Sequence, residues 1–186
     1  MSFKPTVVVV PGLRDEAPGH WQSLLARDLE RVSSLPALGQ QNIDLAARVA
    51  AIETAVRAVD GPVIVVAHSG GAIAAAHWAQ QTQARNVLGA VLATPPVFAA
   101  PLGPDYPPLE QFEEQGWLPL PNGSLPVRTI VAASRNDALG SYEQVAELAR
   151  RWGAELVDLG EVGHLNPASG YGPWPGARTL IARLAG

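Results

Sequence analysis

The sequence contains no cysteine among its 186 residues, and this absence rules out several kinds of chemistry. Without thiols the chain can form no disulfide and no thiolate metal site, and it can use no cysteine nucleophile. Lysine is almost absent as well, because Lys4 is the only one and the other twelve basic residues are arginines scattered along the chain. With a formal net charge of -4, this pattern argues against nucleic acid and anionic membrane surfaces as main partners.

Long hydrophobic runs are missing too. The apolar run over 7–10 is far shorter than the apolar region of a signal peptide, and no stretch is long enough to cross a bilayer. We therefore expect a cytoplasmic protein with no membrane partner. The length and an apolar fraction of 47% fit one domain over 1–186 that buries a substantial core.

The sequence does contain an alternation of short apolar strands and helical patterns. Strands are predicted over 6–10, 62–67, 87–93, 127–132 and 155–159, and the stretch 32–38 is an ambiguous edge strand. Helices are predicted over 19–30, 44–59, 72–81, 142–152 and 176–184, and the stretch 98–126 is irregular and dense in proline and glycine. The pattern predicts an α/β fold, with a parallel sheet of about five to six strands and helices on both faces.

Ser69 is the candidate nucleophile, because it directly follows a predicted strand in the segment Ala67-His68-Ser69-Gly70-Gly71. A serine hydroxyl is a useful nucleophile only when it is exposed, aimed and beside a base, and a tight strand-to-helix turn does the aiming. Strand and helix pass close together in such a turn, so small residues are needed two positions before and after the serine. Ala67 and Gly71 meet this need, although the usual pattern has glycine at both positions. The alternative interpretation is that Ser69 only caps the following helix.

Two backbone N–H groups are predicted to form an oxyanion hole beside this serine. The helix that follows it offers the free N–H of Gly70 at the positive end of the helix dipole. The loop after the first strand offers the second N–H, which we assign to Leu13, and Gly12 permits the close approach.

Asp137 is the candidate acid, because it follows the strand predicted over 127–132 and could hold an imidazole in one tautomer. On its own it is explained equally by an Asx turn or a helix cap. Two other aspartates are weaker candidates: Asp158 lies within or at the tip of its strand, and Asp105 lies in the irregular segment.

His164 is the candidate general base, because it follows the last predicted strand and lies beyond both the serine and the acid in the chain. The other three histidines do not share this placement. His20 and His77 are expected on helices in structural roles, and His68 is expected to point away from Ser69. The order Ser, Asp, His at the carboxyl ends of predicted strands indicates a serine hydrolase.

Several segments carry a wider likeness: Val10-Pro11-Gly12-Leu13, Gly19-His20-Trp21-Gln22, His68-Ser69-Gly70-Gly71, Ala133-Ser134-Arg135-Asn136-Asp137, Gly163-His164-Leu165-Asn166 and Ser169-Gly170-Tyr171-Gly172-Pro173-Trp174-Pro175. Jointly they resemble the small serine hydrolases of the retinoblastoma-binding-protein-9 type, in the α/β-hydrolase superfamily, over nearly the whole chain. The resemblance implies an α/β-hydrolase fold without a large cap domain, acting through Ser69, Asp137 and His164. It does not imply a substrate.

We therefore expect a carboxylesterase-like enzyme that cleaves small esters or activated amides through an acyl-enzyme. Aromatic residues in loops are candidate pocket residues, with packing over the sheet ends as the alternative: Phe98, Trp117, Tyr171 and Trp174. No cofactor or metal is expected, since the histidines lack ligand spacing and no glycine-rich phosphate loop follows the first strand. The alternative function is a protein-binding or scaffold module on the same fold, although the sequence offers no support for a protein partner.

Overall fold

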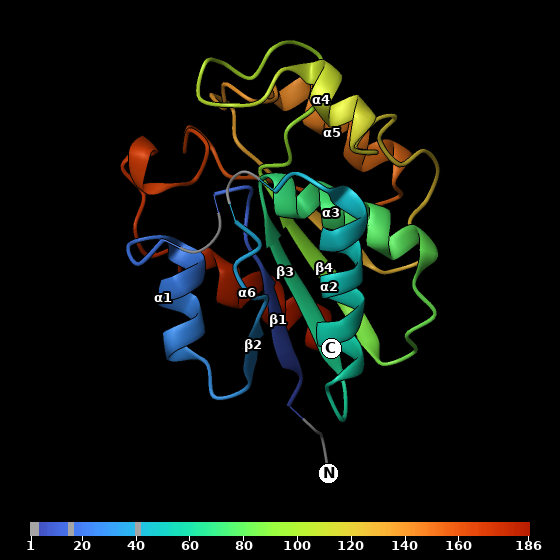
Figure 1. Cartoon of the computed structure of the whole chain (residues 1–186). Helices are drawn as coiled ribbons and strands as arrows, with labels where there is room; N and C mark the ends of the chain where they lie inside the picture. The colour runs from blue at the N-terminus through green and yellow to red at the C-terminus, as the bar shows by residue number, and fades with distance from the viewer. Residues whose placement is uncertain (1–3, 15–16, 40–41) are drawn as a thin grey trace.

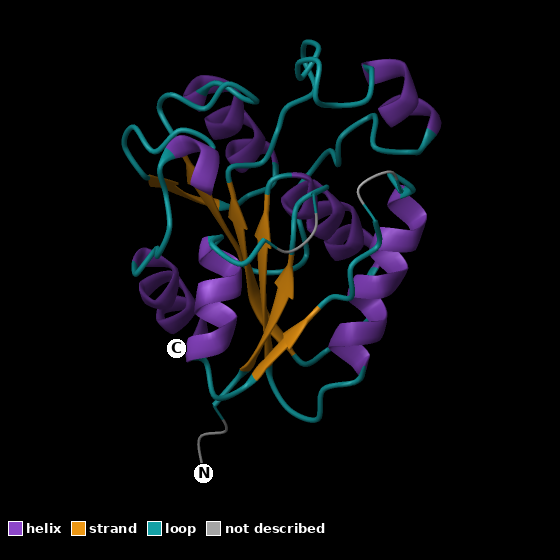
Figure 2. Cartoon of the chain, turned by 60° about the vertical axis from the view of Figure 1, so that its left-hand side comes forward, coloured by secondary structure: helices purple, strands orange, loops and turns teal. Residues whose placement is uncertain are grey.

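The structure, a computed structural model, describes residues 4–14, 17–39 and 42–186. Its centre is a six-stranded parallel sheet in the order β2-β1-β3-β4-β5-β6. The strands are β1 (Thr6–Val10), β2 (Val32–Ser34), β3 (Val63–His68), β4 (Val87–Ala93), β5 (Thr129–Ala133) and β6 (Glu155–Asp158). Figure 1 shows this sheet between layers of helices, and Figure 2 shows the strand arrows rising away from the N-terminal end of the chain.

The helices form two layers on the sheet. They are α1 (Trp21–Asp28), α2 (Leu45–Arg57), α3 (Gly70–Gln81), α4 (Leu109–Glu114), α5 (Tyr142–Arg151) and α6 (Gly176–Ala185), with a 3-10 turn η1 (Pro167–Ser169). Buried residues of α2, α3 and α5 share one apolar core with the sheet, and those of α1 and α6 share another. None of the helices within the described ranges is long and apolar enough to cross a membrane.

The alternation of side chains along β1 explains why its sequence is apolar throughout. Val8 and Val10 belong to the core beneath α2, α3 and α5, whereas Val7 and Val9 belong to the core beneath α1 and α6. All four side chains are at most 4% exposed. A strand covered on both faces has no position for a polar side chain, and the continuous apolar run follows from that.

The predicted α/β fold, with helices on both faces of a parallel sheet and no large cap domain, is confirmed. The element ends differ from the predicted ones by a few residues. The helix after the serine begins at Gly70, two residues earlier than predicted, and the ambiguous stretch contains the edge strand Val32–Ser34. Strand β5 begins at Thr129 instead of Val127, because the Thr129 hydroxyl donates a 2.7 Å hydrogen bond to the Val127 carbonyl and closes a turn there.

The segment 98–126, called the roof segment below, lies beyond the upper end of the sheet and contains the short helix α4 (Figure 1). Phe112 of α4 packs against Phe98 and Trp117, with ring centroids 4.8 and 5.8 Å away. The Trp117 indole N–H donates a 2.6 Å hydrogen bond to the Ile43 carbonyl, which satisfies the one polar atom of this aromatic cluster. The roof segment is therefore anchored by buried rings and not by long regular structure.

Candidate active site

Ser69 lies in the sharp turn between β3 and α3. Its backbone has φ 55° and ψ -129°, a conformation that costs energy for any residue with a Cβ. Ser69 occupies the N-cap position of α3, yet its side chain makes no capping hydrogen bond. The hydroxyl is directed at His164 instead, so the capping interpretation of this serine is wrong.

Two glycines make this turn possible. A Cβ on Gly71 would lie 2.3 Å from the Pro11 carbonyl oxygen, so any larger residue would force α3 away from the loop after β1. A Cβ on Gly12 would lie 3.2 Å from the Ser69 Cβ, which shows how closely that loop approaches the serine. Ala67, two residues before Ser69, is completely buried in β3 and tolerates its methyl group there.

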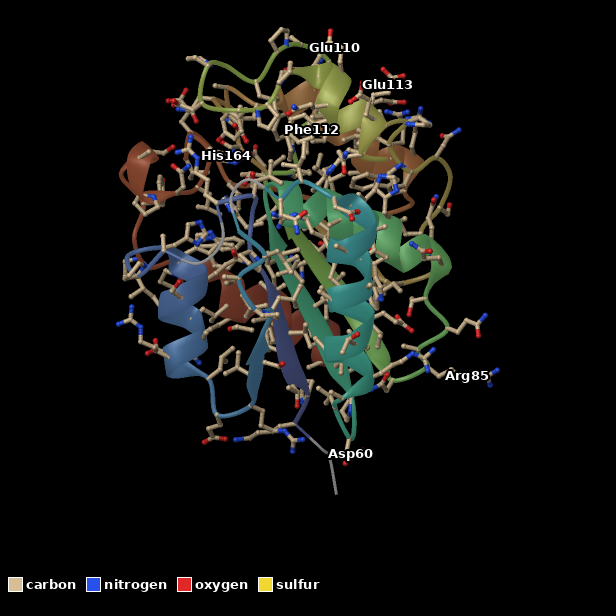
Figure 3. The ribbon with its side chains drawn as sticks, in the orientation of Figure 1. Asp60, Arg85, Glu110, Phe112, Glu113 and His164 are labelled. Atoms are coloured by element: carbon tan, nitrogen blue, oxygen red, sulfur yellow. The ribbon has the colours of Figure 1, made fainter. Side chains whose placement is uncertain are left out.

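The structure brings the three predicted catalytic side chains together. The His164 Nε2 lies 2.7 Å from the Ser69 Oγ, and the His164 Nδ1 lies 2.9 and 3.0 Å from the two Asp137 carboxylate oxygens. A carboxylate can only accept, so Nδ1 carries the proton and Nε2 of the neutral ring is left to accept from the serine hydroxyl. Figure 3 labels His164 near the upper end of the sheet, where the strand arrows of Figure 2 end.

Asp137 is positioned by the loop after β5, and its side chain is only 1% exposed. One of its oxygens also accepts the Leu139 N–H at 2.9 Å, so the Asx turn considered as an alternative exists beside the contact with His164. The competing aspartates are engaged elsewhere. Asp158 forms an ion pair with Arg135, and Asp105 lies 3.7 Å from the Arg14 guanidinium on the surface.

The loop that carries His164 is fixed by polar side chains that sequence reasoning did not assign to the site. Asn136 Oδ1 accepts the Gly163 N–H at 2.6 Å, and Ser134 Oγ accepts the Val162 N–H at 3.3 Å. Ser169 Oγ accepts the N–H of His164 itself at 3.0 Å. The signal was present, because Ser134, Asn136 and Ser169 all lie in the segments that carry the family resemblance.

The two predicted oxyanion donors lie on facing segments. The Leu13 side chain packs against Gly70, where a Cβ would come within 2.9 Å of the Leu13 Cγ. Within the described part of the chain, neither the Leu13 nor the Gly70 backbone N–H has a hydrogen-bond partner. Gly70 begins α3, so its N–H also lies at the positive end of that helix. Both groups can therefore be offered to a negatively charged oxygen beside Ser69.

A cavity of about 230 Å³ opens beside Ser69. Its wall comes from the loop after β1, from β3 and its turn, from the roof segment and from the His164 loop: Gly12, Leu13, Arg14, Ala17, His20, Gln22, His68, Ser69, Tyr106, His164, Asn166, Pro167 and Ala168. Tyr106 is the one ring from the roof segment in this wall. The Arg14 guanidinium lies 5.2 Å from the centre of the Tyr106 ring.

The four aromatic residues predicted to line the pocket do not belong to this wall, so that prediction is corrected. Phe98 and Trp117 are buried in the aromatic cluster of the roof segment. Trp174 packs edge-on against Trp21, with ring centroids 4.7 Å apart, and Tyr171 packs against the same core. Burying a large ring stabilises the fold more than exposing it in an open cavity, which favours packing over the sheet ends.

Gln22 and His20 tie the start of α1 to this cavity. Both amide hydrogens of the buried Gln22 side chain are used, because Nε2 donates to the Val10 carbonyl at 3.0 Å and to the Val66 carbonyl at 3.1 Å. His20 lies just before α1, where its Nδ1 accepts the Gln22 N–H at 3.2 Å. The prediction that His20 lies on a helix is therefore corrected: it caps α1, and its ring lines the cavity.

His68 also departs from the prediction. Its ring does not turn away from the site but lies between the rings of His20 and His164, with centroids 4.6 and 5.0 Å away. Its Nε2 lies 2.9 Å from the His164 carbonyl oxygen, which can only accept, so this nitrogen carries a proton and donates. His77, on α3 as predicted, contacts the Trp117 carbonyl at 3.2 Å.

Burial keeps the two histidines beside His164 uncharged. Desolvation, with a smaller contribution from the nearby His164, lowers the pKa of His20 to about 4. The pKa of His68 is lowered well below its ordinary value, again mainly by burial and then by His164 and His20. Both rings are therefore neutral near pH 7. Among the residues that the structure describes, no group of three or more His, Asp or Glu side chains is arranged to hold a metal ion.

Comparison with known proteins adds a family to this geometry. A family model described as serine hydrolase matches residues 7–183. The chain is similar to a protein from Pectobacterium atrosepticum described as a YdeN-like hydrolase, with 32% identity and a TM-score of 0.82 over 98% of this chain and 91% of that one. No curated protein matches the chain. The resemblance to small serine hydrolases is thus confirmed.

More distant solved structures share the fold alone. The ydeN gene product of Bacillus subtilis is 18% identical, with a TM-score of 0.77 over 97% of this chain and 98% of that one. An esterase from Pyrococcus furiosus is 13% identical, with a TM-score of 0.67 over 98% of this chain and 81% of that one.

Proposed function

The chain belongs to the serine hydrolase family, and from this premise we propose that it cleaves small carboxylic esters or activated amides through an acyl-enzyme on Ser69. The observation that carries the proposal is the unbroken hydrogen-bonded chain from the Ser69 hydroxyl through the His164 imidazole to the Asp137 carboxylate. This arrangement takes a proton from a hydroxyl and returns it to a leaving group.

In the first half of the reaction the Ser69 Oγ attacks the substrate carbonyl carbon while His164 Nε2 takes the hydroxyl proton. The bond from carbon to the leaving oxygen or nitrogen then breaks, and the protonated His164 returns the proton to that leaving group. Asp137 keeps the Nδ1 proton in place and stabilises the imidazolium that forms between these two steps. Water repeats the same steps on the acyl-enzyme, releases the acid and restores the Ser69 hydroxyl.

The Leu13 and Gly70 N–H groups are assigned to the oxygen that becomes negatively charged during each attack. Their lack of described partners and their position on facing segments support this role. A single oxyanion donor of this kind contributes about 3 kcal/mol to the stabilisation of the transition state.

The shape of the site favours small substrates. The cavity of about 230 Å³ lies somewhat below the usual size of sites for drug-sized ligands. No charged side chain other than Arg14 belongs to the described part of its wall when its histidines are neutral. We therefore assign compact acyl esters to this cavity in preference to long-chain ones.

Labelling with a fluorophosphonate probe, read out by mass spectrometry, tests the proposal. The wild-type protein is expected to be labelled at Ser69 and to hydrolyse p-nitrophenyl acetate. Ser69→Ala is expected to abolish labelling and to lower kcat about 10⁴- to 10⁶-fold. Ser141→Ala is the matched control, because Ser141 caps α5 away from the cavity and its loss costs only about 1 kcal/mol of stability.

The opposite result would favour a binding or scaffold module on the same fold. A folded wild-type protein that is unlabelled at Ser69 and hydrolyses none of a panel of esters, thioesters and aminoacyl amides would contradict the proposal. Hydrolysis that survives Ser69→Ala would show that the activity comes from another site.

A further inference from the structure

The cavity contains a hydrogen-bond donor that the reaction does not use. His20 lines the cavity together with Ser69, and its half-buried ring packs at a tilt against His68, with the centroids 4.6 Å apart. Its Nδ1 accepts the Gln22 backbone N–H. A neutral imidazole has one donor and one acceptor nitrogen, so the proton of His20 is placed on Nε2.

This Nε2–H has no hydrogen-bond partner among the described residues. Three other polar groups in the cavity wall are already engaged. Gln22 uses both amide hydrogens on strand carbonyls, His68 donates to the His164 carbonyl, and His164 accepts from Ser69. A polar hydrogen held by a buried scaffold and left without an acceptor is a group that a ligand can satisfy.

From this arrangement we infer that His20 is a specificity-determining residue, whose Nε2–H donates a hydrogen bond to a second, uncharged acceptor oxygen of the substrate. The preferred substrates are then esters or amides that carry an ether, hydroxyl or carbonyl oxygen close to the bond that is cleaved. The inference rests on the proposed function, because the substrate must be held beside Ser69 in the same cavity.

The uncharged state of the His20 ring favours neutral acceptor oxygens over carboxylates. Because burial lowers its pKa to about 4, the ring stays uncharged at neutral pH and does not attract carboxylates as a cation would. The donor is also preorganised. The ring is held by the Gln22 N–H on one side and by His68 on another, and the Gln22 side chain joins this turn to β1 and β3.

Two substitutions separate recognition by His20 from its capping of α1. In His20→Asn the side-chain oxygen stands near the place of Nδ1, so it keeps the cap and loses the donor in the cavity. In His20→Gln the amide N–H reaches the place of Nε2, so it keeps the donor and weakens the cap. A purely structural role predicts damage in the Gln variant, whereas a recognition role predicts damage in the Asn variant.

The measurement compares pairs of esters that differ by one oxygen in place of a methylene. One pair is p-nitrophenyl methoxyacetate and p-nitrophenyl butyrate, which places the oxygen in the acyl part. The other is 2-methoxyethyl acetate and n-butyl acetate, which places it in the leaving group. The ratio of kcat/KM within a pair is compared between variants, so the intrinsic reactivity of each ester and any loss common to both esters cancel.

We expect His20→Asn to lower the oxygen preference about 3- to 10-fold in one of the two pairs, and His20→Gln to keep it within about twofold of the wild type. The pair that responds shows which part of the substrate carries the acceptor. Unchanged ratios in His20→Asn for both pairs, or equal changes in both variants, would overturn the inference. Thermal unfolding of each variant confirms that it is folded at the assay temperature.

A second readout does not depend on turnover. Nitrogen-15 NMR of the wild-type imidazoles at pH 7 is expected to show His20 neutral with its proton on Nε2. A proton on Nδ1 would overturn the inference even in an active enzyme, because no donor would then face the substrate. If none of the four esters is hydrolysed and Ser69 is not labelled, the proposed function fails, and that failure is distinct from a wrong tautomer.

Discussion

The edge of the sheet that carries Ser69, Asp137 and His164 differs from the roof segment in what holds it in place. At this edge, short polar contacts between loops set the geometry, such as the 2.6 Å bond from the Gly163 N–H to Asn136. In the roof segment, three packed rings set it, and Phe112 and Trp117 are both completely buried. The polar contacts between loops orient individual atoms, whereas the packed rings of the roof segment exclude water and stabilise the fold.

This difference predicts that mutations in the two regions separate catalysis from stability. The largest effect is expected at the polar edge, in Asp137→Asn. An amide in place of the carboxylate favours the wrong His164 tautomer, so kcat for p-nitrophenyl acetate is expected to fall about 10⁴-fold. The free energy of unfolding, measured by urea denaturation, is expected to change much less than in a core variant.

The control for that variant is Asp158→Asn, which removes a surface ion pair with Arg135 and leaves the site untouched. Its kcat is expected to stay within about twofold of the wild type, since surface pairs contribute little. A kcat for Asp137→Asn within tenfold of the wild type would remove Asp137 from the catalytic role assigned to it.

In the roof segment, Phe112→Ala is expected to lower the stability of the fold and to leave kcat nearly unchanged. Removing a completely buried ring is expected to lower the free energy of unfolding by about 3–5 kcal/mol, as measured by urea denaturation. Phe112→Leu fills part of the space and is expected to lose less. Because Phe112 is outside the cavity wall, kcat at 25 °C is expected to change little in both variants. A loss of kcat larger than the loss of folded protein explains would show that the two regions are coupled.

The smallest effect is expected in the pH dependence of stability, and it concerns His20 beside the candidate site. The unfolded chain protonates His20 near pH 6.5, whereas the folded protein, in which the pKa is lowered mainly by burial and then by His164, does so at about pH 4. Protonation therefore favours the unfolded state as the pH falls from about 6.5 to 4, and it has no effect above that window. For this half-buried ring the loss is about 2 kcal/mol once solvent screening is included.

Urea denaturation of the wild type and of His20→Gln between pH 7.5 and 4 measures this loss. The carboxylates titrate in both proteins, so their contribution cancels in the difference. The variant is expected to gain stability relative to the wild type as the pH falls. If the free energies of unfolding of the two proteins changed with pH in parallel, His20 would be protonated as easily in the folded protein as in the unfolded chain.

The two regions also differ in how far their structure could be predicted from the sequence. Ser69, Asp137 and His164 each follow a strand, and parallel strands place all their carboxyl ends at one edge, so their meeting follows from topology. The positions of Phe98 and Trp117 depend on how a segment rich in proline and glycine folds back, and nothing in the nearby sequence reveals that.

The predicted placements of His20 and His68 differ from the structure for local reasons. The predicted helix began at Gly19 instead of Trp21, so His20 was assigned to a helix and its capping role was missed. Histidine is not among the preferred capping residues, and no pattern signalled the true start. His68 alternates with its neighbours along β3, but the His164 carbonyl comes within 2.9 Å of its Nε2, a contact between residues 96 apart in the chain.

The Gln22 side chain has a mechanical consequence. By joining the last residue of β1 to β3, it makes the loop with Leu13, the turn with Ser69 and the cap with His20 parts of one stiff body. His164 is held by Ser134, Asn136 and Asp137, and its carbonyl also accepts a hydrogen bond from His68 of β3. Hydrogen bonds from both sides therefore brace the serine turn and the imidazole, which keeps the Ser69 Oγ within 2.7 Å of the His164 Nε2.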